Sequence, residues 1–489
     1  MVAIGDFRSF DFGYSDAGSE FQRAPKLLRE GYYDLGGIED RVLSSHEFLL
    51  LGYKGSGKSA IASRLRLLAN DSPALYSVPD AIHIDRLPLK EFRGVVPDSI
   101  DSHIRHRFVW ELHLLIHVTA SLAKDGQAER KHRKSVGAAQ EQLEKYGVTP
   151  QHPSEMKRLR TNKVTASAGL PQRVANVSAE FNRSTDASTL DDWITYLRDV
   201  ASTFRSQRKH YLFIDGLDDI SLIQESRSSL LGGLIQAAAD LNELFSSSGA
   251  PVKIVVCCRT DLYSRLMLPR AGKIRSDDGL ELNWYQNTRD FQATHLVKLA
   301  NLRARLVDRN CANIFQEFFP DKIGGRDAVE FILLQTRHTP RDLLQLLKIV
   351  KGHVAAPGAI PEDTVKAGTT EYSATYFIGE FRDALNTYFD PEQVRRIEDL
   401  LGSLRKRQFT YAELRAKVDN DARFKDKFDL ENVLAALFDS SFIGNVTPGG
   451  ATGGYEQYYR FKYRNPLASL SYEEDMQFHR GLWKVFNVA

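Results

Sequence analysis

Residues 48–65 read FLLLGYKGSGKSAIASRL, and this stretch decides the fold. The four apolar residues at its start are typical of a buried strand, and the spacing of Ile61 and Leu65 predicts a helix at its end. Between them, the turn from Gly52 to Ser59 has the spacing Gly-x-x-x-x-Gly-Lys-Ser. A strand, a glycine-rich turn and a helix in this order form a cradle, because backbone N–H groups then converge on phosphate oxygens at a helix N-terminus.

The turn matches the Walker A motif, so we expect it to bind ATP. A side chain at Gly55 or Gly57 would block the approach of phosphate to the backbone. Lys58 is expected to reach the β- and γ-phosphates, and the Ser59 hydroxyl is expected to bind Mg²⁺. The predicted nucleotide-binding residues of the turn are Gly52, Lys54, Gly55, Ser56, Gly57, Lys58, Ser59 and Ala60. The alternative, an accidental glycine-rich turn, is disfavoured by the flanking strand and helix.

The composition is that of a soluble globular protein. The chain has 489 residues, 42% of them hydrophobic and 26% charged, which suggests about three domains. A formal net charge of +2 provides no strong overall field for nucleic acid, so any such contact would be local. Three cysteines exclude a disulfide framework and a cysteine-based zinc site. With no long apolar stretch and no signal peptide, we expect a cytoplasmic protein without a membrane span.

A second informative stretch, YLFIDGLDDI at residues 211–220, is an apolar run that ends in acidic residues. It matches a Walker B strand, in which Asp215 at the carboxyl end of a parallel strand would hold Mg²⁺ together with Ser59. Asp218 and Asp219 lie where a carboxylate can orient the attacking water of ATP hydrolysis. The sequence does not distinguish between these two.

The next predicted strand, in VKIVVCCRTDLYSRL, ends in Arg259 and Thr260. P-loop ATPases of the additional-strand type keep a polar sensor of the γ-phosphate at this position. Arg259 is the candidate, because a guanidinium binds phosphate bidentately, and a structural surface arginine is the alternative. Arg265 and Arg270 are weaker candidates for arginine fingers that act on a neighbouring subunit.

The predicted fold class is α/β, with a P-loop NTPase core on a parallel sheet, a helical lid and a C-terminal winged-helix domain. The core spans residues 1–290 and includes a basic insertion at about 124–188. Residues 291–355 form the lid, and residues 366–489 have the helix, helix, strand and glycine-turn order of a winged helix. In the lid, Arg341 lies in the first turn of a helix that Thr339 caps and Pro340 opens, where it is either a second sensor or a surface residue.

The N-terminal residues 1–47 are expected to form a flap packed over the sheet. Asp16 or Ser15 would cap one short helix, and Pro25 would open another. A sharper alternative has this segment contacting the adenine, with Ile38 as a weak candidate. The long helix expected at residues 105–123 carries a histidine pair, His113 and His117, that we expect to be core or boundary residues, because no third metal ligand is visible.

Local basic clusters make nucleic acid a candidate partner. In the insertion they could contact phosphates or an acidic partner, or form a solvated face. These residues are Lys131, Arg133, Lys134, Lys157, Arg158 and Arg160. The predicted recognition helix, Leu430 to Ser441, carries no Lys or Arg, which argues against DNA readout by this helix. The wing residues Arg460, Lys462 and Arg464 keep DNA binding open, and His479 and Arg480 could fold back onto the nucleotide.

Two resemblances follow from these motifs. YLFIDGLDDI followed by VKIVVCCRTDLY resembles the signal-transducing P-loop ATPases, the NACHT and related classes. The combination of DFGYSDAGSEFQ, LGYKGSGKSA, RTDLYSRL, TPRDLL and FIGN…YRFKYRNP more closely resembles a FunZ-like family of predicted bacterial P-loop ATPases, over nearly the whole chain. This resemblance implies ATP binding and hydrolysis but specifies no partner, and some relatives resemble components of bacterial defence against phage.

The expected function is therefore an Mg²⁺-dependent ATPase that acts as a conformational switch, in anti-phage defence or stress signalling. It would assemble with itself or with a separate effector protein. The sequence indicates no Ser-His-Asp arrangement and no nuclease-like carboxylate cluster that would make this chain the effector. One alternative is a DNA-associated ATPase resembling replication initiators and loaders. Another is a nucleotide-binding scaffold with negligible turnover.

Overall fold

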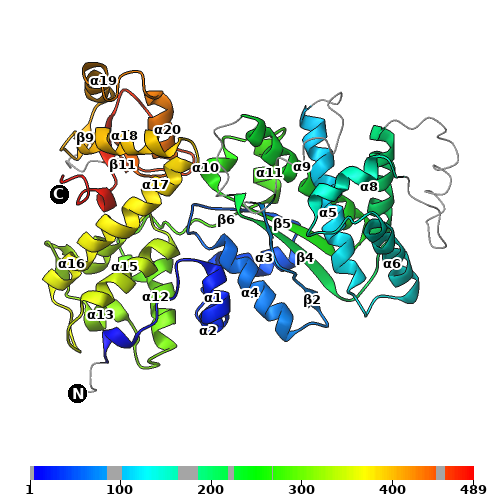
Figure 1. Cartoon of the computed structure of the whole chain (residues 1–489). Coiled ribbons are helices and arrows are strands. Elements are labelled where there is room, and N and C mark those ends of the chain that lie inside the picture. Colours follow the sequence, from blue (N-terminus) through cyan, green and yellow to red (C-terminus); the bar gives the residue numbers. More distant parts are fainter. Residues whose placement is uncertain are drawn as a thin grey trace. The chain divides into compact units, whose positions relative to one another are not determined.

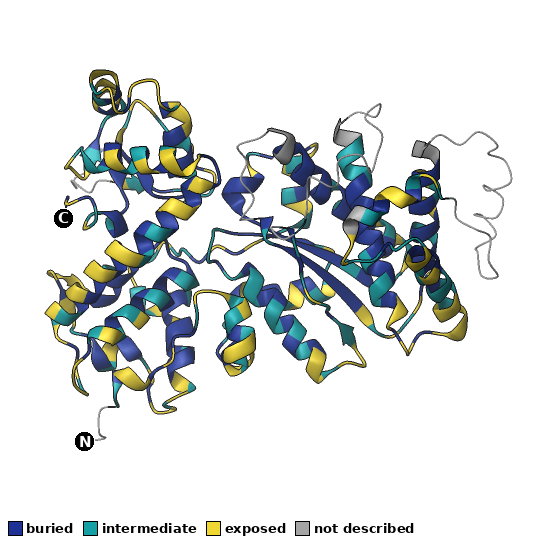
Figure 2. Ribbon diagram, in the orientation of Figure 1, coloured by how far each residue is buried: buried dark blue, intermediate teal, exposed yellow. Residues whose placement is uncertain are grey.

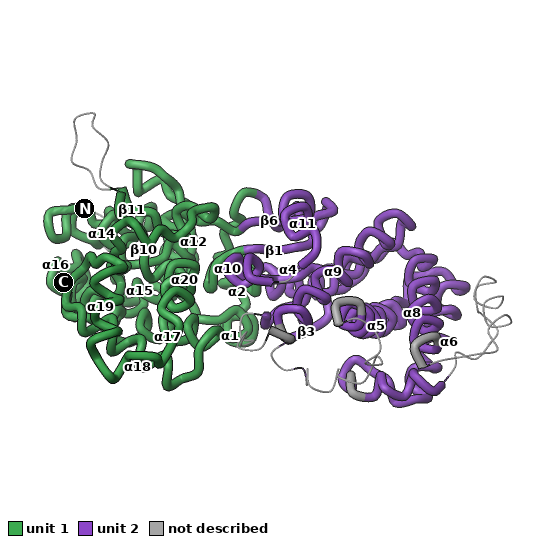
Figure 3. The backbone as a smooth tube through the Cα atoms, turned by 90° about the horizontal axis from the view of Figure 1, so that it is seen from above, with its two compact units in different colours: residues 1–36, 52–60, 282–489 green, residues 37–51, 61–281 purple. Residues whose placement is uncertain are grey.

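The computed structural model describes residues 5–84, 87, 102–162, 186–217, 225–266, 268–447 and 458–488. The protein is a mixed α/β chain that divides into two compact units (Figure 3). Unit 1 comprises residues 1–36, 52–60 and 282–489, and unit 2 comprises residues 37–51 and 61–281. The glycine loop, Gly52–Ser59, belongs to unit 1, although the strand before it belongs to unit 2. None of the helices that the structure describes is long and apolar enough to cross a membrane.

Unit 2 is built on a parallel sheet with the strand order β2-β4-β5-β1-β6, and β3 also pairs with β4. The strands are β1 (Leu49–Leu51), β2 (Tyr76–Ser77), β3 (Ile82–His83), β4 (Lys209–Asp215), β5 (Val252–Cys258) and β6 (Gly279–Glu281). The central strands β1, β4 and β5 are almost entirely buried (Figure 2). Such strands read as continuous apolar runs because both faces of a parallel sheet are covered. The three strands predicted from these runs are confirmed.

The helices of unit 2 cover this sheet and extend its core (Figure 1). They are α3 (Ile38–Ser44), α4 (Lys58–Asp71, which begins in the glycine loop), α5 (Ser102–Ala123), α6 (Arg130–Lys145), η5 (Pro153–Arg160), α8 (Asp186–Thr203), α9 (Glu225–Ser248), α10 (Thr260–Tyr263) and α11 (Ala271–Asp278). The apolar spacing of the sequence predicts helices at 105–123, 189–204 and 230–245, and these correspond to α5, α8 and α9. Ile38, proposed as an adenine contact, is a buried residue at the start of α3.

The region predicted as a basic insertion contains more packed structure than its composition indicates. Helix α6 buries Val136, Ala139 and Leu143, and η5 buries Met156 and Leu159, all in the core of unit 2. These apolar residues are few and lie between charged ones, which concealed their helical spacing. Residues 163–185 lie outside the described part of the chain.

The histidine pair of α5 lies in this core, as expected. The rings of His113 and His117 are 4.7 Å apart, and burial lowers the pKa of His113 well below its ordinary value and that of His117 to about 4. The unfolded chain binds a proton at each histidine near pH 6.5, whereas folded His117 stays neutral until about pH 4. The free energy of unfolding should therefore fall as the pH drops through this window.

We predict that His117→Gln makes unit 2 less sensitive to acid. For a single histidine the free energy of unfolding changes by about 1.4 kcal/mol per pH unit between the two pKa values. Urea unfolding at several pH values from 6.5 to 4 measures this slope. The matched control is the same substitution at an exposed histidine, His152→Gln. An unchanged slope for His117→Gln would contradict the prediction.

Unit 1 is mostly helical. Its helices are α1 (Ala17–Arg23), α2 (Pro25–Arg29), α12 (His295–Arg305), α13 (Ile314–Phe318), α14 (Ala328–Leu333), α15 (Pro340–His353), α16 (Glu362–Tyr372), the π-helix η8 (Ser373–Phe377), α17 (Ile378–Asn386), α18 (Pro391–Gly402), α19 (Tyr411–Asn420) and α20 (Leu430–Asp439). The predicted caps are confirmed: Asp16 accepts from the backbone of Ser19, and Thr339 accepts from that of Asp342. The sequence also predicts a helix from Trp284 to Val307. The helix is present as α12, but the predicted start is wrong, because the chain is irregular until Phe291 and α12 begins at His295.

The N-terminal aromatic segment packs within unit 1. The ring of Phe7 lies 5.6 Å from that of Phe318 and 5.4 Å from that of Phe319, and Phe10 lies 5.4 Å from Phe318. These rings therefore find apolar partners at the end of α13, in the helical part of unit 1. A buried ion pair between Glu20 and Arg303, with Oε1 and Nη1 2.6 Å apart, fixes α1 in the same unit.

The C-terminal part of unit 1 combines α18, α19 and α20 with an antiparallel sheet of order β11-β10-β12-β9. Its strands are β9 (Gln408–Phe409), β10 (Ile443–Thr447), β11 (Tyr458–Arg460) and β12 (Asp475–Phe478). Helix α20 is largely buried, and its exposed residues are Glu431 and Asn432 in the first turn. The glycine turn of the predicted wing, residues 448–457, lies outside the described residues.

Candidate functional site: the glycine loop and helix α15

The glycine loop starts from the carboxyl edge of the parallel sheet. Within unit 2, Leu51 pairs with Cys258, and Ile214 pairs with Val256, so β1, β4 and β5 end at the same edge. Gly52 follows Leu51 directly in the chain. Asp215, the last residue of β4, is 8% exposed, and its Oδ1 accepts a hydrogen bond from the N–H of Gly216 at 2.9 Å. Asp218 and Asp219, the candidates for orienting water, lie outside the described residues.

The loop needs its glycines for both backbone and space. Gly55 has φ +84° and Gly57 has φ +106°, in the left-handed region that residues with side chains rarely adopt. A Cβ atom at Gly55 would lie 2.8 Å from the Cβ of Arg341, and one at Gly52 would lie 2.4 Å from the Oγ of Ser56. The loop is therefore a tight cradle that substitution at these positions would distort.

Lys58 is held inside this cradle. It is 4% exposed, and its Nζ donates to the carbonyl oxygens of Gly52 at 3.0 Å and Tyr53 at 3.3 Å. Ser59 and Ala60 follow it, half-buried, in the first turn of α4. An ammonium group beside left-handed glycines, at the start of a helix, is an arrangement that fits phosphate oxygens.

Two further features support the cradle. The indole Nε1 of Trp284 donates to the carbonyl oxygen of Ser56 at 2.8 Å, which fixes the middle of the loop. The Oγ of Ser56 is buried and has no hydrogen-bond partner among the residues that the structure describes. A buried hydroxyl without a partner is costly, so it is available to a ligand that enters the loop.

Helix α15 begins directly against the loop. The backbone N–H of Arg341 donates to the carbonyl oxygen of Gly55 at 3.3 Å, in the first helical turn after the cap Thr339. The guanidinium of Arg341 is 26% exposed, and its Nη1 lies 3.8 Å from Oε1 of Glu380. Of the predicted sensor residues, Arg341 is thus the one that the structure brings beside the loop within unit 1.

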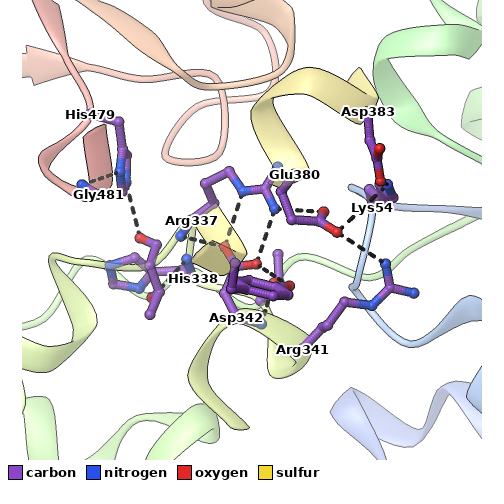
Figure 4. A network of polar contacts seen from close by, with 12 residues as sticks. Lys54, Arg337, His338, Arg341, Asp342, Glu380, Asp383, His479 and Gly481 are labelled. Atoms are coloured by element: carbon purple, nitrogen blue, oxygen red, sulfur yellow. Dashed lines mark hydrogen bonds and ion pairs between the residues drawn. The ribbon is translucent and has the colours of Figure 1, made fainter. Parts of the chain in front are cut away.

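Glu380 of α17 connects the loop to α15 (Figure 4). Its Oε1 lies 3.6 Å from Nζ of Lys54, and its Oε2 lies 3.0 Å from Nη2 of Arg337. Lys54 also donates to Asp383 at 2.9 Å. Arg337 in turn donates to both carboxylate oxygens of Asp342, at 3.0 Å from Nε and from Nη2. A loop lysine, two arginines and three carboxylates therefore form one network.

The buried members of this network are ionised. Burial alone would raise the pKa of the Glu380 carboxyl, but Arg337, Lys54 and Arg341 outweigh it and lower the pKa below its ordinary value. For Asp342, burial is likewise outweighed by Arg337, and the pKa is lowered. Burial opposes the charge of Arg337, yet the two carboxylates hold its pKa well above its ordinary range. Each of the buried charges of Arg337, Asp342 and Glu380 thus has a neighbour of opposite sign.

The turn before α15 is anchored by the C-terminal residues of the chain. His338 has φ +51°, and its ring stacks on that of Tyr463 with centroids 5.1 Å apart. The N–H of Gly481 donates to Nδ1 of His479, so Nε2 of that ring donates to the carbonyl oxygen of Thr336, 3.1 Å away. Burial lowers the pKa of His338 to about 3 and that of His479 well below its ordinary value. His479, which on the sequence could fold back onto the nucleotide, lies on this turn.

Arg259 is engaged within unit 2. It is 3% exposed, and its Nε donates to Oδ1 of Asp261 at 3.0 Å, in the first turn of α10. Burial would raise the pKa of Asp261, but the guanidinium outweighs this and lowers it. Asp261 therefore takes up the Nε and Nη2 donors of Arg259. The finger candidates differ in exposure, with Arg265 half-buried and Arg270 exposed at the start of α11.

The structure also brings together a serine, a histidine and an aspartate that the sequence did not indicate. In unit 2, Ser121 Oγ lies 3.0 Å from Nδ1 of His210, and Nε2 of that ring lies 3.1 Å from Asp125 Oδ2. His210 is 2% exposed and Asp125 1%. Burial lowers the pKa of His210 despite Asp125. We assign this buried set a structural role, joining the end of α5 to β4.

One family comparison matches part of the chain. Residues 294–377 match the FunZ-associated C-terminal helical domain. The matched stretch runs from the cap of α12 to the end of η8 and includes Arg337, Arg341 and Asp342. No curated protein matches the chain.

Proposed function

We propose that this chain is an Mg²⁺-dependent P-loop ATPase that acts as a conformational switch. The observation that carries the proposal is the glycine loop, with Gly55 and Gly57 in the left-handed region and Lys58 held at the start of α4. The proposed nucleotide contacts are the loop residues and Arg341. Mg²⁺ would take the ligands predicted from the sequence, Ser59 and Asp215, and would neutralise charge on the phosphate oxygens. Asp218 or Asp219 would orient water, and Arg259 would sense the γ-phosphate.

The switch would work by competition for cations. In the structure, Arg341 and Lys54 face the carboxylate of Glu380. Phosphate oxygens carry more charge than one carboxylate and would compete for Arg341 and Lys54, whereas Arg337 would stay with Asp342 and Glu380. ATP would thereby loosen the loop and α15 from α17. Binding to only one of two conformations, at a concentration about a thousandfold above Kd, shifts the equilibrium by about 4 kcal/mol, which suffices for a switch.

Phosphate release from ATP tests the enzymatic part. We expect release by the full chain in the presence of Mg²⁺ and none when the metal is chelated. ATP binding without any release would instead favour the nucleotide-binding scaffold. Absence of both binding and release would refute the proposed function.

We predict that Glu380→Gln keeps ATP binding but weakens the switch. The amide no longer competes strongly for Arg341 and Lys54, so ATP should bind several-fold more tightly, and the ATP-dependent change in protease sensitivity should shrink. Isothermal titration and limited proteolysis measure the two effects. Glu398→Gln on α18, which removes a partner of Arg382, is the matched control. Equal ATP affinity and an equal proteolytic response in wild type and Glu380→Gln would contradict the competition mechanism.

We also propose that residues 366–489 contain a winged-helix domain. The order of α18, β9, α19, α20, β10 and β11 supports this. Buried α20 offers no basic face, so we assign this domain to contacts with protein, either a second copy or an effector. The proposed setting, anti-phage defence or stress signalling, rests on the sequence resemblance and on the FunZ-associated helical domain. Size measurement with and without a slowly hydrolysed ATP analogue tests assembly.

A further inference from the structure

Unit 2 carries a concentrated basic surface, whose residues are distant in sequence from the glycine loop. Its residues belong to the end of α5, the start of α6 and the chain after α8. We call it the α6 basic face, and its residues are Lys124, Arg130, Lys131, Arg133, Lys134 and Arg205. All six are exposed. The chain as a whole has a formal net charge of only +2, so this density of positive charge is local.

The cations of this face have few anionic partners. Glu129 lies 3.3 Å from Lys131, and the nearby Asp125 is buried beside His210. Among the described residues, Lys124, Arg130, Arg133 and Lys134 form no ion pair with a carboxylate. The guanidinium of Arg205 donates to backbone carbonyl oxygens, including that of Ser248 at 2.6 Å. Most of the positive charge is therefore uncompensated.

The position of the charges opposes helix stability. Arg130, Lys131, Arg133 and Lys134 occupy the first turns of α6, where the positive end of the helix dipole disfavours cations. The first turn has no acidic residue, and the Glu129 side chain does not cap the helix. Folding alone does not account for this pattern, whereas binding of an anion would.

The face is held in place by packing on its opposite side. Val136, Ala139 and Leu143 bury the other side of α6. The ring of His132 lies 6.0 Å from that of Phe204, which brings the start of α6 beside Arg205. The cations therefore project from an ordered helix rather than from a solvated insertion.

The composition of the face favours one class of polyanion. A helix that binds a lipid surface needs an exposed apolar side, but the apolar side of α6 is buried in the core. An acidic protein partner would be expected to meet exposed aromatic or methionine anchors. The large exposed hydrophobic residues of the described chain are Leu75, Val307, Tyr458, Leu467 and Tyr472, and none of them belongs to the segments that carry the six cations. Backbone phosphates require only the cations.

We propose that the α6 basic face binds the phosphate backbone of nucleic acid without reading its sequence. Arginine and lysine ends neutralise successive phosphates. In the described parts of the segments that carry these cations, no Phe, Tyr or Trp is exposed, so they offer no platform for base stacking. The α6 basic face would thus bind nucleic acids of different base sequence with similar affinity. This inference does not depend on ATP binding at the glycine loop.

The experiment uses the full chain and a fluorescently labelled DNA duplex of arbitrary sequence, about 20 base pairs long, titrated at several salt concentrations between about 50 and 200 mM. The test variant is K131Q/R133Q/K134Q. We expect its affinity to fall about tenfold or more at low salt. The logarithm of the association constant falls linearly with the logarithm of the salt concentration. The steepness of this fall should lessen by about 0.9 for each phosphate contact removed.

Two further variants make the result specific. R423Q/K425Q/K427Q removes the same number of exposed positive charges from unit 1 and should bind as wild type does. K131R/R133K/K134R keeps the charge and should also bind normally. The unfolding temperature of K131Q/R133Q/K134Q should equal or exceed that of wild type, since removing these cations relieves the helix dipole.

Three results would overturn the proposal. One is equal loss of affinity in K131Q/R133Q/K134Q and R423Q/K425Q/K427Q, which would mean that net charge alone acts. Another is unchanged binding by K131Q/R133Q/K134Q. The third is equal or tighter binding of polyglutamate or of vesicles containing phosphatidylserine through the same residues, which would assign the face to an acidic protein or to a lipid surface.

Discussion

Lys58→Ala should abolish ATP hydrolysis. Its ammonium group is buried against the carbonyl oxygens of Gly52 and Tyr53, inside the loop that we propose binds the phosphates. Loss of a preorganised positive charge at the reacting phosphates typically lowers kcat by about 10²- to 10³-fold. ATP affinity should fall as well, because the lysine also contacts the bound ground state. Phosphate release and equilibrium binding of a fluorescent ATP analogue measure the two effects.

Lys298→Ala is the matched control for this variant, since it removes an exposed lysine from α12. It should hydrolyse and bind ATP as wild type does. If Lys58→Ala keeps wild-type turnover, the site of hydrolysis is not the glycine loop. If Lys58→Ala and Lys298→Ala lose activity equally, the loss reports general instability, and if neither loses activity, the assay reports a contaminating ATPase or another site.

Arg337→Leu should strongly destabilise unit 1. Arg337 is buried, with Asp342 and Glu380 both 3.0 Å from its Nη2. Its removal leaves two carboxylates buried without their main cation. Breaking such a buried network from one side costs about 3–5 kcal/mol of unfolding free energy. Urea unfolding, followed by a probe in unit 1, measures the loss.

The pH dependence of this effect has a definite sign. In the wild-type protein the pKa values of Glu380 and Asp342 lie below their ordinary values. The two carboxylates therefore contribute their full stability at a pH above the ordinary pKa values. This contribution is lost as the pH falls through the pKa values of the folded state. In Arg337→Leu the carboxyl pKa values should rise, and acid should stabilise the variant relative to neutral pH. R337L/D342L/E380L, which removes the whole set of charges, should recover much of the loss. A single variant as stable as wild type would contradict the role of the network.

The sequence predicted best those structural features whose residues are neighbours in the chain. Gly52 to Ser59 form one contiguous motif, and Asp215 ends an uninterrupted apolar run, so local order alone predicted the loop and the strand. The cap Thr339 and the residue pair Pro340 and Arg341 are local in the same sense. Such features depend on hydrogen bonds between residues a few positions apart, which a sequence displays directly.

The Glu380 network could not be predicted in this way. Arg337 and Glu380 are separated by 43 residues, and Lys54 is farther still. One signal was present, because Glu380 lies at helical spacing between the buried residues Phe377 and Ala384. A lone carboxylate on an apolar helix face indicates a buried partner but does not identify it. The contact of Trp284 has the same origin, because its indole hydrogen-bonds the carbonyl oxygen of Ser56, 228 residues earlier in the chain.

The discontinuity of unit 1 has a consequence for biosynthesis. The residues that brace the glycine loop, Trp284, Arg341 and Glu380, are translated more than two hundred residues after the loop itself. On the ribosome, strand β1 can therefore find its sheet partners in unit 2 long before Gly52–Ser59 acquires its supports. Because domains fold as their last segment emerges, the nascent chain lacks the complete set of loop supports until α17 is made. If the loop binds ATP as we propose, an unfinished chain would be unable to respond to it.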